Sequence, residues 1–354
     1  MTTSRLMSLV ALVSAAGCGP HVPPVEAPAR IAPHDAVVDS RFPGRAGDRI
    51  DGSPTYRTIT AALDAAPDAS PRPHVIFIRN GRYHEKLSVD KAHITLLGES
   101  RDSTVLTYDA SADTPQPGGG TYGTKGSFTL RITATDFRAE HLTVENAFDY
   151  RANAAKAATD PTKAKNSQAV ALHADRGSDR AVFVDCLFSG WQDTVYANSG
   201  RSYFLNCVIL GHTDFIFGGG VAVFDDCDIV SRAAGFIAAP STPPLQRYGF
   251  VFVASRLRRE SNAVKPQSVA LGRPWHPSSN PDVNPSAVYI DCDMDDHISA
   301  TAWASMGGYE PATARFYEYH SHGVGATKDK SRRLLSDEEA SHYAVIDVLG
   351  GWML

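Results

Sequence analysis

Two aspartates occupy matching places in a repeated stretch of the chain, and their spacing could support acid–base or nucleophilic chemistry. Asp193 follows Cys186 by seven residues, and Asp214 follows Cys207 by seven residues. If the repeat sets both acids about 5 Å apart on successive turns of chain, the two carboxylates cannot both ionise cheaply and their pKa values separate. A pair split in this way supplies a proton donor together with a base or a nucleophile at one pH.

The alternative interpretation is a pair of solvated acids at a turn. The neighbours of the two acids argue against it, because Gln192 adjoins the first acid and aromatic residues follow both. No lysine or arginine stands beside either acid to form a routine surface ion pair.

A recurring pattern in the same stretch predicts the elements that position these acids. The pattern is an aromatic residue, two further residues and a cysteine. Its copies end at Cys186, Cys207, Cys227 and Cys292, and Phe252–Ser255 is a degenerate copy. The first three cysteines lie 21 and 20 residues apart. A period near 20 built from short strands indicates a β-solenoid in which each repeat forms one coil.

Elsewhere, short β-branched and aromatic runs alternate with turn residues and predict further strands, for example within 74–79, 93–97 and 128–134. The best helical spacing of apolar residues lies in 58–66. The expected fold class is therefore all-β.

The stacked cysteines raise the question of a disulfide. Equivalent residues on neighbouring coils lie about 4.8 Å apart, which falls within the Cα separations of about 4.4–6.8 Å that disulfides adopt. Three consecutive cysteines allow only one adjacent pair at a time. The spacing alone does not choose between Cys186–Cys207 and Cys207–Cys227.

Composition excludes several classes of protein. The chain has 354 residues, of which 43% are hydrophobic and 21% charged, as in an ordinary soluble globular protein and unlike a disordered one. Its formal charge of −5 argues against a nucleic-acid-binding protein, because such proteins usually carry an excess of basic residues.

The N-terminus predicts export. Arg5, the apolar run 6–16 and the small residues before Cys18 are typical of a signal peptide over residues 1–17. Cys18 then becomes a candidate for lipidation in a bacterial lipoprotein, and plain secretion is the alternative. Residues 18–44, rich in proline and alanine at their start, are expected to form a tether before a domain at 45–354. The protein is thus expected either in the cell envelope or outside the cell. Membrane attachment, in the first case, is expected to be through Cys18.

Other motifs fail on inspection. Residues 118–123 satisfy G-x-G-x-x-G but open no predicted helix, so they do not indicate a dinucleotide site. Asp291, Asp293 and Asp295 imitate the start of a calcium loop, but its later positions carry Asp296 and Ala302 in place of glycine and glutamate. No metal site or other cofactor is expected.

Three blocks of sequence, in order along the chain, resemble the signature blocks of the pectinesterases, the bacterial branch most of all. They are Gly190-Trp-Gln-Asp-Thr-Val-Tyr196, Gly211-His-Thr-Asp-Phe-Ile-Phe-Gly218 and Leu271-Gly-Arg-Pro-Trp275. Weaker matches extend the similarity over about residues 45 to 353. The resemblance implies a single-stranded right-handed parallel β-helix, in agreement with the solenoid, and hydrolysis of the methyl esters of pectin.

The resemblance also implies a role for each matched residue. Asp214 matches the nucleophile, Asp193 the proton donor and later base, and Arg273 the arginine that pairs with the nucleophile. Gln192 and Gln168 match the amides that stabilise the oxyanion. The following residues match the substrate-binding cleft: Thr124, Tyr196, Phe217, Trp275 and Met306. Cys207 and Cys227 match the paired cysteines, and no cofactor is implied.

Two residues depart from the second block as the family usually has it. Thr213 stands where valine precedes the acid, and His212 stands before it where a small residue is common. Both positions border the expected cleft and could change substrate preference. We expect His212 to be a solvated turn histidine, the alternative being an added titrating group.

Other functions remain to be weighed against the esterase. Lyases and polygalacturonases share the β-helix, but the Arg-Pro-Trp block and the Gln-Asp pair favour an esterase. Another acyl ester or a thioester could be the substrate of the same machinery. A binding module without activity would be expected to have lost at least one of Asp193, Asp214, Gln192 and Arg273. The sequence defines no oligomeric state, and a monomer is the default expectation.

Overall fold

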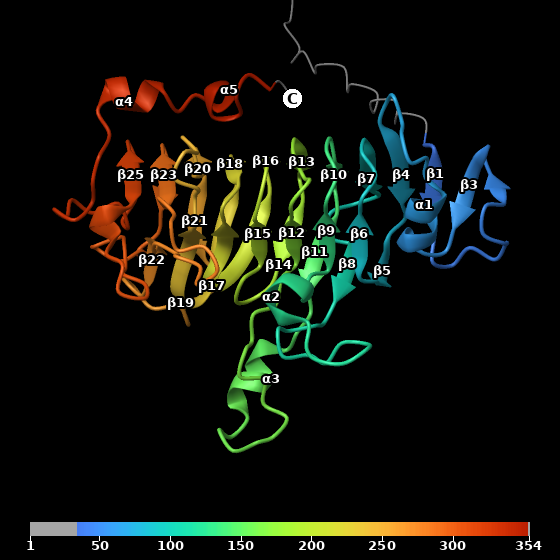
Figure 1. The fold of residues 1–354 in the computed structure, drawn as a ribbon, viewed down its shortest axis with the longest axis horizontal. Coiled ribbons are helices and arrows are strands. Elements are labelled where there is room, and N and C mark those ends of the chain that lie inside the picture. Colours follow the sequence, from blue (N-terminus) through green and yellow to red (C-terminus); the bar gives the residue numbers. More distant parts are fainter. Residues whose placement is uncertain (1–33, 353–354) are drawn as a thin grey trace, which may run out of the picture. The chain divides into compact units, whose positions relative to one another are not determined.

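Short strands stack in parallel on three faces of a coil, so the protein folds as a parallel β-helix (Figure 1). A computed structural model describes residues 34–352. The predicted all-β solenoid is confirmed, and each coil contributes one short strand to each face where the coil is complete.

The first face is one continuous sheet, parallel except for the antiparallel pairing of its edge strand with the next. Its strands, in spatial order, are β2 (Arg49–Ile50), β3 (Ser53–Tyr56), β1 (Ala36–Val38), β4 (His74–Ile78), β7 (Ile94–Gly98), β10 (Arg138–Glu140), β13 (Ala181–Val184), β16 (Arg201–Leu205), β18 (Val221–Asp225), β20 (Phe250–Val253), β23 (Ser286–Ile290) and β25 (Arg315–Tyr319).

The other two faces share two long strands that bend from one face to the next. The second face holds β5 (Gly81–His84), β8 (Thr104–Tyr108), β11 (Thr143–Asn146), β14 (Leu187–Ser189), the first halves of β17 (Val208–Gly218) and β19 (Asp228–Pro240), β21 (Arg256–Arg259) and β24 (Asp293–Met294). The third face holds β6 (Leu87–Val89), β9 (Leu130–Ile132), β12 (Leu172–Ala174), β15 (Val195–Ala197), the second halves of β17 and β19, and β22 (Val269–Gly272).

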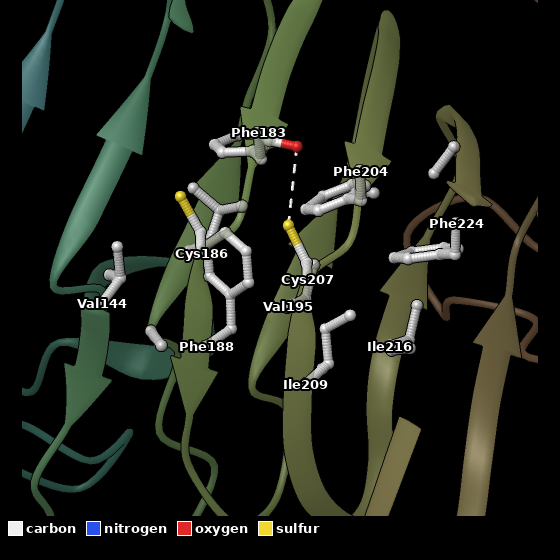
Figure 2. Packing of buried hydrophobic residues seen from close by; sticks show 14 of the residues in the cluster. Val144, Phe183, Cys186, Phe188, Val195, Phe204, Cys207, Ile209, Ile216 and Phe224 are labelled. Carbon is white, nitrogen blue, oxygen red and sulfur yellow. Dashed lines mark hydrogen bonds between the residues drawn. The ribbon is translucent and has the colours of Figure 1, made fainter. Parts of the chain in front are cut away.

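The aromatic residue of the repeat forms a ladder inside the coil. Phe183, Phe204, Phe224, Phe252 and Tyr289 are fully buried, and their rings stack in turn with centroids 4.6, 4.7, 4.7 and 4.2 Å apart. Figure 2 shows the first three rings, Phe183, Phe204 and Phe224, on successive strands. Each added coil therefore buries a ring against the previous one, which explains why the repeat keeps an aromatic residue at this position.

The expected disulfide between Cys207 and Cys227 is absent. Both are buried free thiols, as are Cys186 and Cys292, and the Cys207 thiol donates instead to the carbonyl of Phe183 at 3.5 Å (Figure 2). In-register parallel strands hold equivalent residues about 4.8 Å apart, whereas a disulfide needs Cβ atoms about 3.5–4.5 Å apart. The Cys227 thiol likewise donates to the carbonyl of Phe204 at 3.5 Å.

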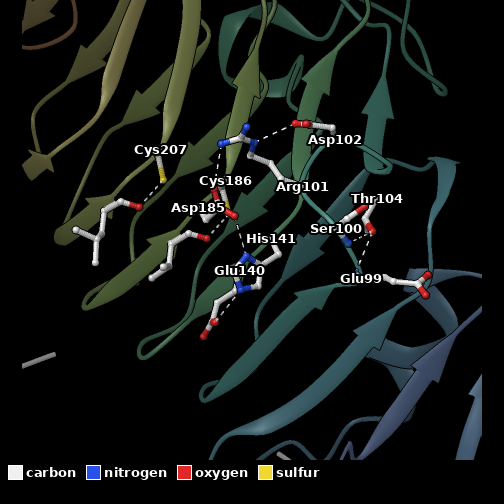
Figure 3. Close-up of polar contacts among 12 residues, drawn as sticks. Glu99, Ser100, Arg101, Asp102, Thr104, Glu140, His141, Asp185, Cys186 and Cys207 are labelled. Atoms are coloured by element: carbon white, nitrogen blue, oxygen red, sulfur yellow. Dashed lines mark hydrogen bonds and ion pairs between the residues drawn. The ribbon is translucent and has the colours of Figure 1, made fainter. Parts of the chain in front are cut away.

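Polar side chains secure the turn that leaves the first face (Figure 3). Asp185, which follows β13 with a left-handed φ of 48°, accepts from Arg101 Nη1 at 3.0 Å and lies 2.9 Å from His141 Nδ1. These contacts tie three coils together at one corner.

The folded region begins before the expected boundary at residue 45. Strand β1 (Ala36–Val38) pairs in parallel with β3 and β4, so residues 34–44 belong to the β-helix and not to a tether. This strand belongs to the β-helix because the side chains of Ala36 and Val38 are buried in the core, with the half-buried Val37 between them. The expected signal peptide and Cys18 lie outside the described residues.

In the part of the chain that the structure describes, five α-helices lie outside the faces: α1 (Ile59–Ala65), α2 (Gly123–Gly126), α3 (Tyr150–Ala155), α4 (Asp337–Ser341) and α5 (Val345–Val348). The helix expected within 58–66 is α1, whose first turn is capped by the Thr58 side chain. Among residues 34–352, no helix has the length and hydropathy needed to span a bilayer.

The C-terminal segment covers the outer side of the first face. Val348 and Leu349 of this segment are buried in one cluster with Val182, Val223 and Val288 from three strands of that face. Arg201 Nη1 donates to the Leu349 carbonyl at 2.8 Å, which joins residues 148 positions apart. Figure 1 shows α4 and α5 running along the ends of these strands.

Candidate active site

The outer side of the third face carries an aromatic floor. Tyr196, Phe217 and Ala239 are register partners on β15, β17 and β19, and the rings of Tyr196 and Phe217 stack with centroids 4.2 Å apart. The ring of Trp275 packs at an angle against the ring of Phe217, with centroids 5.7 Å apart. Alternation along the strands turns these side chains outward, while their neighbours Val195 and Ile216 enter the core.

The two aspartates lie beside this floor on neighbouring coils, as their spacing predicts. Asp193 occupies the turn between β14 and β15, and Asp214 occupies the bend of β17. A parallel bridge joins Gln192 to Thr213, and the Asp193 amide donates to the Thr213 carbonyl at 3.1 Å. Both acids adopt left-handed backbone conformations, with φ of 66° and 50°.

Arg273, directly after β22, holds the second acid with a bidentate contact. Its Nε lies 2.8 Å from Asp214 Oδ1, and its Nη2 lies 2.6 Å from Oδ2. The guanidinium also lies over the Phe236 ring, 3.9 Å from the centroid. This fork fixes the plane of the Asp214 carboxyl group, because two parallel N–H donors contact its two oxygens.

The first acid lies in the opposite electrostatic environment. Asp193 is 7% exposed, and burial raises the pKa of its carboxyl well above the usual range. The charge of Asp214 raises this pKa further, and the charge of Arg273 opposes the rise. The two acids therefore lie in different surroundings: Asp193 is buried next to another carboxyl group, and Asp214 makes a bidentate contact with a guanidinium.

Two glutamine amides border the acids. Gln192 Oε1 accepts a hydrogen bond from the Ser167 hydroxyl at 3.3 Å, so the side-chain nitrogen of Gln192 takes no part in that contact. The Gln192 carbonyl accepts from the Ala169 amide at 3.1 Å, so this turn is tied to the segment that carries Gln168. Within residues 34–352 the side-chain oxygen of Gln168 is buried without a partner.

One cavity of about 350 Å³ is lined by every catalytic and substrate-binding residue that the sequence predicts. Its predicted lining residues are Asp193, Asp214, Gln192, Arg273, Gln168, Trp275, Thr124, Tyr196, Phe217 and Met306. Sequence reasoning missed Lys125 and Ala239, which line the same cavity. Ala239 could have been found from its register with Phe217, but nothing in the motif distinguishes Lys125 from a surface lysine.

His212 is not the solvated turn histidine that we expect from the sequence. It is 6% exposed, because Tyr150 of α3 packs against it with ring centroids 4.4 Å apart. Burial lowers its pKa, so the imidazole is neutral near pH 7. The segment that covers His212 comes from more than fifty residues away, which is why the local sequence suggested exposure.

Arg273→Lys tests the fork on Asp214. A lysine ammonium cannot make the planar bidentate contact, so we expect kcat to fall by about 10²-fold while the protein stays folded. The measurement is initial rate of ester hydrolysis at saturating substrate. Arg256→Lys is the matched control, because Arg256 also contacts carboxylates, those of Asp226 and Asp228, outside the cavity. An unchanged rate in Arg273→Lys would show that the fork does not prepare Asp214.

One cavity on the outside of a parallel β-helix thus combines an aromatic floor with paired carboxyl groups, an arrangement typical of an enzyme active site. Comparison with known proteins gives the family. The family model described as Pectinesterase matches residues 49–351, and the chain belongs to that family.

Individual relatives agree with this assignment. The chain is 42% identical to Pectinesterase A of Dickeya dadantii over 324 residues, covering 84% of this chain and 88% of the relative. A solved pectin methylesterase from Erwinia chrysanthemi superposes with a TM-score of 0.83 at 39% identity, covering 91% of this chain and 99% of the other. Another, a pectin methylesterase in complex with a hexasaccharide, gives a TM-score of 0.84 at 38% identity, again covering 91% and 99%. The protein is therefore an enzyme of the pectinesterase class.

Proposed function

We propose that this pectinesterase hydrolyses the methyl esters of pectin, a methylated polygalacturonate, with Asp214 as nucleophile and Asp193 as general acid and base. The observation that carries the proposal is the contrast between the two acids. Arg273 makes a bidentate contact with Asp214, whereas burial and the charge of Asp214 raise the pKa of Asp193 well above its usual range. The hexasaccharide complex of a similar enzyme supports a galacturonate chain as the occupant of the cleft.

The first half of the reaction forms an acyl-enzyme. A carboxylate oxygen of Asp214 attacks the C6 carbonyl carbon of a methyl galacturonate, and the carbonyl electrons move to its oxygen. The amides of Gln192 and Gln168 donate to this developing oxyanion. When the tetrahedral intermediate collapses, the bond from C6 to the methoxy oxygen breaks and Asp193 gives its proton to the departing methanol.

The second half returns the enzyme to its starting state. Asp193, now a carboxylate, takes a proton from water as the water oxygen attacks the acyl carbon. The bond to Asp214 breaks, the galacturonate leaves as a free acid, and Asp193 is protonated again. Each turnover consumes one water and releases one methanol and one carboxyl group.

The test is methanol release from highly methylated pectin, measured together with polymer length. We expect methanol and new carboxyl groups in equal amounts and an uncut polymer. Cutting of the polymer would assign the site to depolymerisation. No methanol from folded protein would move the assignment to another acyl ester or a thioester.

We further propose that the chain is exported and that Cys18 is its lipid anchor. The support is the apolar run 6–16 followed by small residues and Cys18. Cys18→Ser should shift the protein from the membrane fraction to the soluble fraction, as followed by fractionation and immunoblotting of the full chain. Wild-type protein in the soluble fraction would refute the anchor and leave plain secretion.

A further inference from the structure

Three side chains form an aromatic cluster beside the cavity, to which the proposed reaction gives no role. Tyr150 of α3 stacks on Trp191 with centroids 5.2 Å apart and planes at 19°. The same tyrosine ring lies 4.4 Å from the ring of His212, and Trp191 meets His212 edge-on at 5.8 Å. We call Tyr150, Trp191 and His212 the aromatic clamp.

Two arginines pack against the indole of the clamp. The guanidinium of Arg232, on β19, lies 4.2 Å from the Trp191 ring centroid and also donates to the Gly190 carbonyl at 2.9 Å. Arg151, next to Tyr150 on α3, lies 4.8 Å from the same centroid. Glu260 contacts both arginines, at 3.0 and 3.7 Å. The half-buried indole therefore packs mainly against protein groups.

The clamp adjoins both turns that carry the acids. Trp191 immediately precedes Gln192 and Asp193, and His212 lies two residues before Asp214. The amide of His212 donates to the Trp191 carbonyl at 2.9 Å, so the backbones of the two turns also meet at the clamp. Both acids have positive φ, a conformation that is strained for a residue with a side chain and persists only where surrounding contacts hold it.

We propose that the aromatic clamp is a positioning device for catalysis, in which Tyr150 from α3 locks the turns of Asp193 and Asp214 against each other and thereby sets the Gln192 amide. Tyr150, Trp191 and His212 are positioning residues and touch no reacting atom. The inference rests on the proposed roles of Gln192, Asp193 and Asp214. It gives His212, the departure from the family's usual pattern, a function as an aromatic partner of Tyr150; burial keeps its imidazole neutral and suited to that packing.

The clamp and the aromatic floor make different predictions for kinetics. Tyr196, Phe217 and Trp275 line the cavity, whereas Tyr150, Trp191 and His212 do not. Loosening the clamp should therefore misplace the reacting groups without removing contacts to the sugar chain. A loss confined to the transition state lowers kcat and leaves KM nearly unchanged.

The experiment is steady-state kinetics of methanol release by Tyr150→Leu and Tyr150→Phe in the full chain, at temperatures well below unfolding. We expect kcat of Tyr150→Leu to fall by about 10- to 100-fold, the range that small misplacement of catalytic groups produces, with KM within about twofold of wild type. Tyr150→Phe keeps the aromatic ring, so its kcat should stay close to that of wild type. Tyr343→Leu is the matched control, because it removes a half-buried tyrosine that packs on Tyr248 outside the cavity.

A double-variant cycle with His212→Ala completes the test. If the clamp acts as one unit, the double variant should lose no more kcat than the more damaging single variant. The proposal would be overturned by an unchanged kcat in Tyr150→Leu or by additive losses in the cycle. A rise in KM alone would also overturn it, because Tyr150 would then be a substrate-binding residue. Failure of the roles proposed for the two acids is distinguishable, because Asp214→Ala would then retain activity.

Discussion

Asp214→Ala should abolish turnover, lowering kcat by at least about 10⁴-fold while the fold persists. The variant removes the atom that attacks the ester, and no other unprotonated carboxylate lines the cavity to replace it. The variant also leaves Arg273 without its bidentate partner, so some loss of stability is expected. Circular dichroism and thermal unfolding should establish that the inactive protein is folded at the assay temperature.

Asp228→Ala is the matched control for this loss of an ion pair. Asp228 accepts from Arg256 Nε at 2.6 Å, and it lies outside the cavity. We expect this variant to keep wild-type turnover. If Asp214→Ala retains activity, Asp214 is not the nucleophile; if both variants lose it, the effect belongs to stability.

Asp193→Asn should also be nearly inactive, because an amide can neither protonate the departing methanol nor accept a proton from water. We expect kcat to fall by about 10²- to 10⁴-fold, the usual contribution of a positioned acid–base group. Single-turnover measurement of methanol would show whether acyl-enzyme formation is the step that fails. Retention of wild-type kcat would remove Asp193 from both proton transfers.

The same substitution should stabilise the protein at neutral pH. Burial raises the folded-state pKa of Asp193, so its contribution to stability is complete below the unfolded-chain value near about 4 and is lost as pH rises through the folded pKa. Asparagine has no charge to bury, so the stability advantage of Asp193→Asn should grow with pH over that interval. Thermal unfolding from pH 4 to 8 checks it, and a constant difference would contradict the raised pKa.

Much of this fold could be predicted because a parallel β-helix repeats locally. The aromatic–cysteine pattern sets the coil length, and the coil length alone brings Asp193 beside Asp214. The strands within 74–79 and 93–97 and the helix after Thr58 also follow from short-range patterns. Tyr196 and Phe217 lie 21 residues apart, the same spacing as the two acids. Arg273 and Trp275 needed the family's motifs, since their distances along the chain carry no such periodic signal.

The errors arose where long-range packing decides the outcome. The N-terminal boundary was misplaced because β1 is only three residues long and its partners lie 18 and 40 positions further on. His212 was expected in solvent because nothing in its own block reveals that Tyr150 covers it. The expected disulfide is also not formed, and the thiols of Cys207 and Cys227 instead donate to backbone carbonyls of the preceding coils.

The C-terminal segment imposes an order on biosynthesis. Val182, Val223 and Val288 lie on the outer side of the first face and are covered by residues that follow them in the chain by about sixty positions or more. Until Leu349 reaches Arg201, the growing chain displays an uncovered apolar strip across several coils. This face is therefore completed only after residues 345–349 have been synthesised, however early its own strands have formed.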